Sequence, residues 1–346
     1  MSAERRGVAI IGAGDMGRRH AEHWASSGAR VVVVCDPDGG RASGLAARYE
    51  AASCAEPLEG VAWDGVDVVS VCTPTYLHAA ITVRALEAGR DVLCEKPVAL
   101  TLADAESMAA AERASKGRLR IGFMRRFDPL WWRVEHDRAD LGGPLMAQAT
   151  LAAGVRPKLL MHDARANGGP VIDMACHVFD RWERLFGRPA EEISAVGHTY
   201  GADKPELAGL EHVALDTVQV ALRYGEAGSA QLQLTWGLPS GTPMRERHTY
   251  LGPGGLLEVD GDVVTRTQGA TPESFAPDVV DPWREEVTAF ARELDGDGPQ
   301  GLADVQDGIR ALRASLAVLA SVREGRPVRP EALPEETARA GAPVTS

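Results

Sequence analysis

The chain has 346 residues, of which 45% are hydrophobic and 5% aromatic, so it is long and apolar enough for two compact domains. Its formal net charge is -12 at pH 7, and no stripe of Lys and Arg stands clear of acidic neighbours, which argues against nucleic acid as a partner. No stretch approaches the ~20 apolar residues of a membrane span, and the apolar run before the first glycines is only as long as a strand, so we expect neither a membrane anchor nor a signal peptide.

The first third of the sequence predicts a parallel sheet. Its strands are expected in five short apolar runs: residues 8–11, 31–34, 66–71, 92–94 and 119–123. These runs show little polar alternation, as is typical of strands covered on both faces, and the helical patterns between them predict right-handed parallel crossovers. We therefore expect an α/β fold class, with a doubly wound Rossmann domain over residues 1–125.

Beyond residue 126 the pattern changes from continuous apolar runs to alternation. Segments such as 217–222 alternate apolar and polar side chains, which predicts antiparallel strands with one solvated face. We expect a second, α+β domain over residues 126–326, built on a large, open, mostly antiparallel sheet. The last helices, 282–294 and 302–323, are expected to pack back on the first domain, and the Pro/Ala/Glu-rich tail 327–346 to be loosely held.

The cysteines form no CxxC pair and mostly lie in apolar, strand-like runs: Cys35, Cys54, Cys72, Cys94 and Cys176. Cysteines in such runs are typical of reduced, buried thiols. We therefore expect a cytoplasmic enzyme whose thiols stay reduced.

A glycine-rich GxGxxG motif follows the first strand and opens a helix: Gly12, Ala13, Gly14, Asp15, Met16 and Gly17. Gly12 permits the tight turn, Gly14 lets the backbone approach a pyrophosphate, and Gly17 lets the helix pack on the strand. The helix N-terminus adds its dipole and its free N–H groups. Asp36 closes the second strand nineteen residues after Gly17, close to the ~20 residues expected for an acid that binds ribose.

The acid at Asp36 also indicates which dinucleotide binds. It can accept hydrogen bonds from both ribose hydroxyls but repels a 2′-phosphate, and the next residues offer no cation before Arg41. The sequence therefore favours NAD over NADP. The alternative is a glycine-rich turn that only ends a strand, which does not explain the matched acid.

Two polar segments follow the runs 66–71 and 92–94, and they contain Thr73, Pro74, His78, Glu95, Lys96 and Pro97. Because ligands of such sheets bind outside the carboxyl ends of the strands, both segments should face one crevice beside the nicotinamide. A cation at Lys96 can there hydrogen-bond a substrate oxygen and stabilise alkoxide character during hydride transfer. The alternative is a surface lysine after a strand.

A third segment pairs a carboxylate with an imidazole. Asp173 and His177 are four residues apart, so a helix would place them on one face, and Asp180 lies within one further turn. A carboxylate that orients an imidazole is a general acid/base arrangement. Two alternatives stay open, a surface ion pair and part of a metal site, although the sequence has no HExxH motif and no clustered third ligand.

Together, these motifs resemble those of one known family. The residues that carry the resemblance are Gly12, Gly14, Gly17, His20, Cys72, Thr73, Pro74, His78, Glu95, Lys96, Pro97, Gly168, Gly169, Asp173 and His177. Over nearly its whole length the chain resembles the glucose-fructose oxidoreductase / inositol dehydrogenase / rhizopine catabolism (Gfo/Idh/MocA) family. Residues 122–128 look especially like the inositol dehydrogenase branch. The resemblance implies a Rossmann domain and an open-sheet domain for substrate binding and oligomerisation, as a homodimer or homotetramer.

The resemblance also implies site residues. Lys96 is expected to be catalytic, with Asp173 and His177 beside the substrate. The expected cofactor-binding residues are Gly12, Gly14, Asp15, Met16, Gly17, Asp36, Thr73, Pro74, His78, Glu95, Lys96 and Arg125, and the expected substrate-binding residues are Lys96, Arg126, Asp173, His177 and Trp236. No metal is expected.

For two residues the sequence favours a packing role or leaves it open. His20 is read as a packing residue at the contact of helix and sheet. Trp236 stands where inositol dehydrogenases tend to place tyrosines, and its indole suits the C–H face of a sugar or cyclitol ring. A core tryptophan is the open alternative, and the difference makes myo-inositol itself a less expected substrate.

We expect NAD-dependent interconversion of a secondary alcohol and a ketone on a sugar, amino sugar or cyclitol. Either His177, oriented by Asp173, or Lys96 takes the hydroxyl proton, and the sequence leaves both open. The alternatives are a ketosugar or inosose reductase of deoxysugar or aminocyclitol biosynthesis, an NAD-retaining glycosidase or transhydrogenase, and, least expected, a non-catalytic NAD-responsive regulator.

Overall fold

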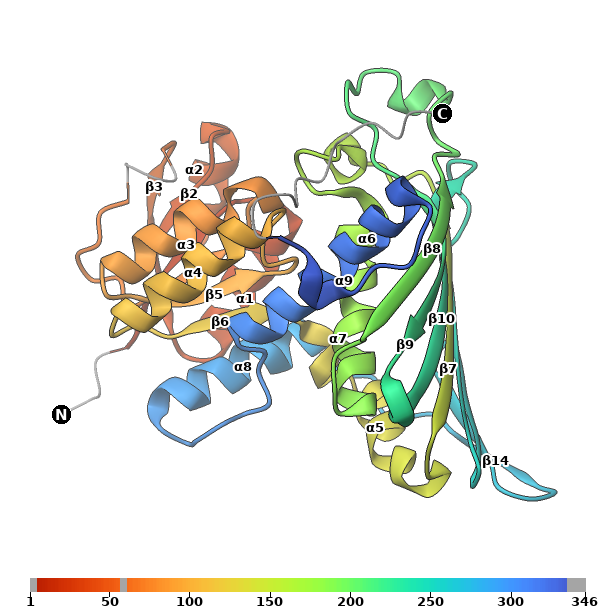
Figure 1. Cartoon of the computed structure of the whole chain (residues 1–346). Helices are drawn as coiled ribbons and strands as arrows, with labels where there is room; N and C mark the ends of the chain where they lie inside the picture. The colour runs from red at the N-terminus through yellow and green to blue at the C-terminus, as the bar shows by residue number, and fades with distance from the viewer. Residues whose placement is uncertain (1–4, 57–60, 335–346) are drawn as a thin grey trace. The chain divides into compact units, whose positions relative to one another are not determined.

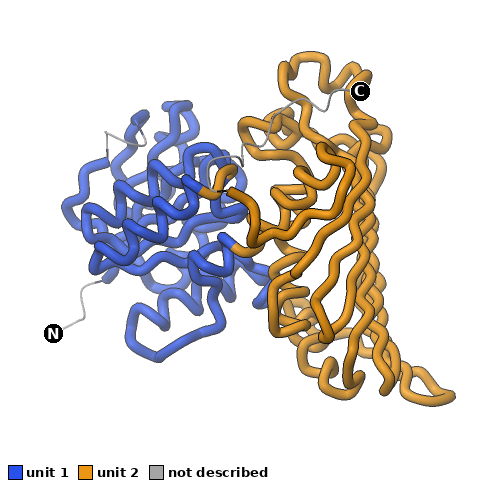
Figure 2. The backbone as a smooth tube through the Cα atoms, viewed as in Figure 1, with its two compact units in different colours: residues 1–99, 103–127, 281–309 blue, residues 100–102, 128–280, 310–346 orange. Residues whose placement is uncertain are grey.

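The computed structural model describes residues 5–56 and 61–334, and the chain forms two compact units, shown in different colours in Figure 2. The first unit consists of the described residues up to 99, together with 103–127 and 281–309. The second consists of 100–102, 128–280 and the described residues from 310 onward. Residues 281–309, which the sequence division placed in the second domain, thus belong to the first unit.

The first unit is a parallel sheet with the strand order β3-β2-β1-β4-β5-β6 (Figure 1). Its strands are β1 (Gly7–Ile11), β2 (Arg30–Cys35), β3 (Ala52–Cys54), β4 (Val68–Val71), β5 (Asp91–Glu95) and β6 (Leu119–Gly122). All neighbouring strands pair in parallel. The strand order reverses between β1 and β4, the position at which such sheets bind their ligands. The predicted doubly wound sheet is confirmed.

Helices connect these strands: α1 (Asp15–Ser26), α2 (Gly39–Ala47), η1 (Thr75–Leu77), α3 (His78–Glu87), α4 (Leu102–Ala114) and η2 (Met124–Phe127). A late helix, α8 (Pro282–Asp295), begins at an Asp281 whose carboxylate accepts from two N–H groups of its first turn and ends at Gly296 in the left-handed region. It packs on α1, where Trp24 and Phe290 meet edge to face with ring centroids 6.1 Å apart. This contact makes α8 part of the core of the first unit.

The second unit is an eight-stranded sheet with the order β14-β13-β12-β11-β7-β10-β9-β8. Its strands are β7 (Leu145–Gly154), β8 (Glu192–His198), β9 (Thr217–Arg223), β10 (Gly228–Leu238), β11 (Arg245–Gly252), β12 (Gly255–Asp260), β13 (Val263–Thr267) and β14 (Pro272–Phe275). The pair β7–β10 is parallel and the other pairs are antiparallel. The predicted mostly antiparallel sheet is therefore confirmed.

Alternation along the strands decides which face of this sheet is covered. In β10, Ala230, Leu232 and Leu234 are buried, whereas Gln231 and Gln233 between them are exposed. The buried face packs against the helices of the unit, α5 (Pro129–Leu141), α6 (Gly169–Asp173), α7 (Ala175–Phe186) and, from residue 310 onward, α9 (Val305–Glu324) (Figure 1). Four single-turn helices complete the unit: η3 (Leu159–His162), η4 (Pro205–Leu207), η5 (Gly225–Ala227) and η6 (Pro330–Ala332).

The beginning of the tail is held more firmly than expected. Val328 and Ile193 exchange two backbone hydrogen bonds of 2.8 Å each, and Pro330 is buried in η6. The expectation of a loosely held tail is thus wrong for residues 327–334, because a strand edge accepts the chain there, and residues 335–346 lie outside the described part. Within the described residues, no helix has the length and apolar character to cross a membrane.

Candidate active site

The loop between β1 and α1 has the room and the donors that a pyrophosphate needs. Gly12 has φ +98°, and a Cβ there would lie 2.6 Å from a carbonyl oxygen after β4. A Cβ at Gly17 would lie 1.7 Å from the carbonyl oxygen of Gly12, so only glycine lets α1 start here. A Cβ at Gly14 would meet no atom of the described residues within 4 Å. Gly14 directly precedes α1, so a phosphate in this space can accept from the N–H groups of the first helical turn, at Asp15 and Met16.

Asp36 is fixed at the end of β2 by two backbone donors. Its Oδ2 accepts from the N–H of Ala13 and its Oδ1 from the N–H of Asp38, each at 2.8 Å. Both oxygens keep a further lone pair with which they can accept a ribose hydroxyl. The residues present therefore fit NAD, and the carboxylate would repel the additional phosphate of NADP.

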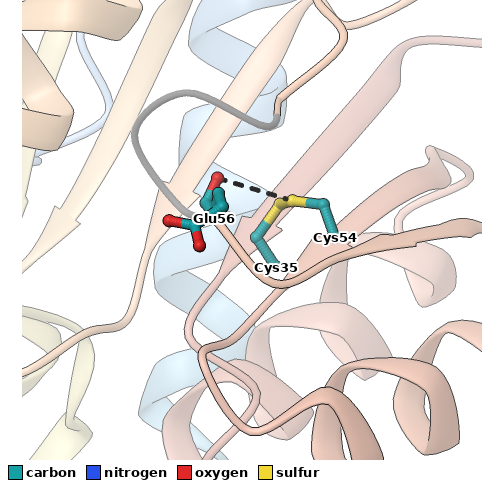
Figure 3. Close-up of a disulfide and its surroundings, with 3 residues drawn as sticks. All are labelled: Cys35, Cys54 and Glu56. Atoms are coloured by element: carbon teal, nitrogen blue, oxygen red, sulfur yellow. Dashed lines mark hydrogen bonds between the residues drawn. A yellow bond between two sulfur atoms is a disulfide. The ribbon is translucent and has the colours of Figure 1, made fainter.

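Cys35 and Cys54 form a disulfide next to Asp36 (Figure 3). They are opposite each other in the parallel pair β2–β3, with Cα atoms 4.6 Å apart, and the Cys54 sulfur lies 3.8 Å from the carbonyl oxygen of Glu56. The expectation of reduced thiols is wrong for this pair, because the register of a strand without an apolar pattern brings the two sulfurs together. The other three cysteines are not part of a disulfide: Cys72, Cys94 and Cys176.

His78 joins the segments that follow β4 and β5. Its Nδ1 lies 2.8 Å from the carbonyl oxygen of Pro97 and its Nε2 lies 3.0 Å from that of Thr73. Burial lowers the pKa of this imidazole, and the two carbonyl acceptors act against that effect. The structure thus brings both predicted polar segments, with Pro74 at the start of η1, to one edge of the sheet.

Lys96 follows β5 directly and is half-buried. Its N–H donates to Oε2 of Glu95 at 3.1 Å. Burial acts to raise the pKa of Glu95, but the hydrogen bond and charge of His20 and the charge of Lys96 outweigh burial and leave this pKa lowered. An ionised carboxylate beside Lys96 favours the ammonium form of the lysine.

The two predicted arginines lie in η2. The side chain of Arg126 is 6% exposed and pairs with Asp307 at 3.1 Å, and its guanidinium carbon lies 5.9 Å from the ring centroid of Phe123. Arg125 is half-buried in the same turn. A contact of either residue with cofactor or substrate stays a prediction.

Glu286 on α8 is a further candidate residue that the sequence motifs do not indicate. This residue is 1% exposed, and neither of its carboxyl oxygens has a hydrogen-bond partner among the described residues. Burial, followed by the nearby Glu95 carboxylate, raises the pKa of Glu286 well above its usual range, against the opposing charge of Arg126. The available signal was its spacing, three residues after Trp283 and four before Phe290, on the apolar face of a predicted helix.

In the second unit, two left-handed glycines start the helix that ends at Asp173. Gly168 and Gly169 have φ values of +79° and +69°. A Cβ at these positions would lie 2.7 Å from the Cβ of Ile172 and 2.4 Å from the Cβ of Ala214. Only glycine therefore permits this turn, which sets the position of α6 and of the Asp173 carboxylate at its end.

Asp173 and His177 do not lie on one unbroken helix. The N–H of His177 donates to the carbonyl of Met174 at 3.3 Å, and the thiol of Cys176 donates to the carbonyl of Asp173 at 3.2 Å. The expectation of a single helix is wrong, because this tighter turn separates α6 from α7. Asp173, His177 and Asp180 are all buried, which excludes an exposed surface pair.

Trp236 lies within the core of the second unit. It is 3% exposed and meets His162 edge to face, with ring centroids 5.9 Å apart. Its backbone N–H donates to the backbone carbonyl oxygen of Asp216 at 2.9 Å. This position favours the core interpretation, and a contact with substrate stays a prediction. The described residues contain no cluster of three or more His, Cys, Asp or Glu side chains that could hold a metal ion.

Comparison with known sequences gives matches over both units. Residues 6–123 match the family described as "Oxidoreductase family, NAD-binding Rossmann fold", and residues 132–258 match the "GFO/IDH/MocA C-terminal domain". The chain is 31% identical over 357 aligned residues to inositol 2-dehydrogenase 4 of Saccharopolyspora erythraea, which covers 94% of this chain and 96% of that protein. It is also 31% identical over 236 residues to scyllo-inositol 2-dehydrogenase (NAD(+)) of Bacillus subtilis, covering 66% and 67% of the two chains.

A solved structure has the same fold. An oxidoreductase from Agrobacterium radiobacter, in complex with NAD+, L-tartaric acid and magnesium, superposes with a TM-score of 0.81. The match covers 95% of this chain and 99% of that one at 16% sequence identity, so it supports the architecture alone.

Proposed function

Since the chain belongs to the Gfo/Idh/MocA family of NAD-binding oxidoreductases, we propose that it interconverts a secondary alcohol and a ketone on a cyclitol or a sugar, with inositols as the first substrates to test. The predicted family, enzyme class and NAD cofactor are confirmed by the membership. The proposed substrate class rests on one observation, the similarity to inositol 2-dehydrogenase 4 along nearly the whole chain.

When bound, NAD would supply the acceptor for the hydride that leaves the carbinol carbon. The imidazole of His177, oriented by the Asp173 carboxylate, takes the hydroxyl proton. The Lys96 ammonium donates a hydrogen bond to the same oxygen and stabilises the negative charge that develops on it. The lowered pKa of Glu95 supports this role, because an ionised carboxylate favours the charged form of a neighbouring lysine.

The test is a panel assay of NADH formation with inositols, aminocyclitols and hexoses, and of NADH consumption with inososes and ketosugars. Lys96→Met and His177→Ala should each lower kcat by about 10² or more, while the Kd of NAD stays within about threefold. Lys116 and His198 are exposed, so Lys116→Met and His198→Ala are matched controls that should behave as the wild type.

The outcomes separate the alternatives. Turnover of a cyclitol that is lost in Lys96→Met supports the proposal, whereas normal turnover in Lys96→Met contradicts the catalytic role of the lysine. Faster turnover of ketones than of alcohols at matched concentrations would favour a biosynthetic reductase. Cofactor that stays with the protein through dialysis would favour an NAD-retaining enzyme.

A further inference from the structure

A chain of hydrogen bonds between buried side chains leads from α1 to the backbone of Lys96. The indole N–H of Trp24 donates to Oγ of Ser70 at 3.1 Å, and the same oxygen lies 2.8 Å from Nδ1 of His20. On the other side of the imidazole, Nε2 lies 3.1 Å from Oε1 of Glu95. The second oxygen, Oε2, accepts the N–H of Lys96. His20, Ser70 and Trp24 have no exposed surface.

The donors and acceptors of this hydrogen-bond network determine in which direction each hydrogen bond is donated. An ionised Glu95 can only accept, so Nε2 of His20 carries the hydrogen. Indole can only donate, so the oxygen of Ser70 accepts from Trp24, and its hydroxyl hydrogen is free to donate to Nδ1. With Nε2 protonated, each of these polar atoms therefore has a partner.

Packing does not require this arrangement. His20 and Glu95 lie beside an apolar core that α1 and the parallel sheet share, and a buried polar pair there adds little net stability compared with apolar side chains of similar size. What the pair does provide is geometry, since a hydrogen-bonded imidazole fixes the carboxylate and the carboxylate fixes the next peptide N–H. That N–H belongs to the lysine of the proposed reaction.

We propose that His20 is a positioning residue, which holds Lys96 in its working geometry through the Glu95 carboxylate. On the other side of the lysine, His78 holds the carbonyl of Pro97 at 2.8 Å. Lys96 thus lies between two segments that are each anchored by a buried imidazole. This inference rests on the role of Lys96 in the proposed function.

The charge of Glu95 enters the inference as well. Several titratable or charged groups lie near Glu95 or near the neighbouring Glu286 on α8. They are His20 on α1, Cys72 after β4, His78 on α3, Cys94 and Lys96 on either side of Glu95, and Arg126 on η2. His20 hydrogen-bonds the carboxylate at Oε1 through its side chain. Without that donor, burial would raise the pKa of Glu95, and the ammonium of Lys96 would lose charge support.

Two amide substitutions separate positioning from packing. In His20→Gln the amide nitrogen can occupy the place of Nε2 and donate to Glu95. In His20→Asn the amide reaches only the place of Nδ1, so the contact with Ser70 is kept and the contact with Glu95 is lost. Both replacements are polar and smaller than histidine, so a pure packing role predicts similar effects of the two.

We expect His20→Asn to lower kcat by about tenfold or more and His20→Gln to stay within about threefold of the wild type. The KM for NAD should change little in both, because the glycine-rich loop is untouched. In His20→Asn the basic limb of the pH profile of kcat/KM should move to lower pH, because the Lys96 ammonium would lose the support of an ionised Glu95.

Wild-type kcat and an unchanged pH profile in a folded His20→Asn protein would overturn the positioning role, as would equal losses in the Asn and Gln variants. If His20→Asn does not fold, Glu95→Gln tests the same hydrogen bonds by changing one atom, and normal turnover in that variant overturns the proposal. Normal turnover in Lys96→Met would instead refute the proposed function, so the two failures are distinguishable.

Discussion

Replacing Glu286 by glutamine should remove a pH-dependent destabilisation of the first unit. Glu286 is 1% exposed, and its carboxyl oxygens have no hydrogen-bond partner within the described residues. Burial and the Glu95 carboxylate raise its pKa well above the usual range, which favours the protonated form of this acid in the folded protein. Glutamine has the same shape and carries no charge at any pH.

The sign and size of the effect follow from proton linkage. In the unfolded chain the carboxyl ionises near its ordinary pKa of about 4.3. Between that value and the raised native pKa, the native state binds one proton more than the unfolded state. The free energy of unfolding of the wild type therefore falls by about 1.4 kcal/mol for each pH unit as the pH rises through this window. Glu286→Gln should lack this contribution.

The measurement is urea unfolding of wild type and Glu286→Gln from about pH 5 to about pH 8, scored on the transition that NADH shifts to higher urea. The variant should gain stability over the wild type with increasing pH, by up to about 1.4 kcal/mol per unit. Glu285, the exposed neighbour on the same helix, gives the control Glu285→Gln, which should run parallel to the wild type. Parallel curves for Glu286→Gln would refute the reasoning, because Glu286 would then be ionised in the native state.

Two further predictions concern the nucleotide-binding edge. Gly14→Ala should leave thermal stability unchanged, because its Cβ meets open space, but it should weaken NADH binding by about tenfold or more. Gly17→Ala should instead unfold the first unit, because its Cβ would lie 1.7 Å from a carbonyl oxygen. Equal unfolding of the two variants would contradict this assignment. Cys54→Ser should lower the free energy of unfolding by about 3 kcal/mol, since the disulfide closes a loop with a sequence separation of 19. Alkylation of the unfolded wild type without reductant should modify three cysteines. Modification of all five would contradict the disulfide.

The sequence predicted the first unit well where the physical signal is local. Continuous apolar runs mark strands buried on both faces, and the glycine pattern with its matched acid marks the nucleotide loop. The boundaries shifted slightly, since the run 66–71 forms a strand only from Val68 onward. The strand β3 was missed because Ala52 and Ser53 are exposed and carry no apolar pattern. With that strand, the partner of Cys35 was missed too.

Contacts between distant segments could not be predicted from the sequence. The hydrogen bond from His20 to Glu95 spans 75 residues, and neither residue type announces it, because a lone helical histidine is most often a packing residue. The parallel pairing of β7 with β10 is equally non-local, and alternation alone predicts antiparallel neighbours. The break between Asp173 and His177 depends on one backbone turn that spacing cannot reveal.

Glu95 and Glu286 together explain why one buried carboxylate beside the proposed catalytic lysine can stay ionised. Two nearby carboxyl groups in an apolar core do not both carry charge easily, so their surroundings decide which one keeps its proton. Glu95 accepts hydrogen bonds from His20 and from the N–H of Lys96, whereas Glu286 has no hydrogen-bond donor among the described residues. The pKa of Glu286 is therefore raised and that of Glu95 lowered, so the proton favours Glu286 and the negative charge favours Glu95. Because this assignment depends on the donor at Nε2, His20 determines both the geometry of Lys96 and the negative charge beside it.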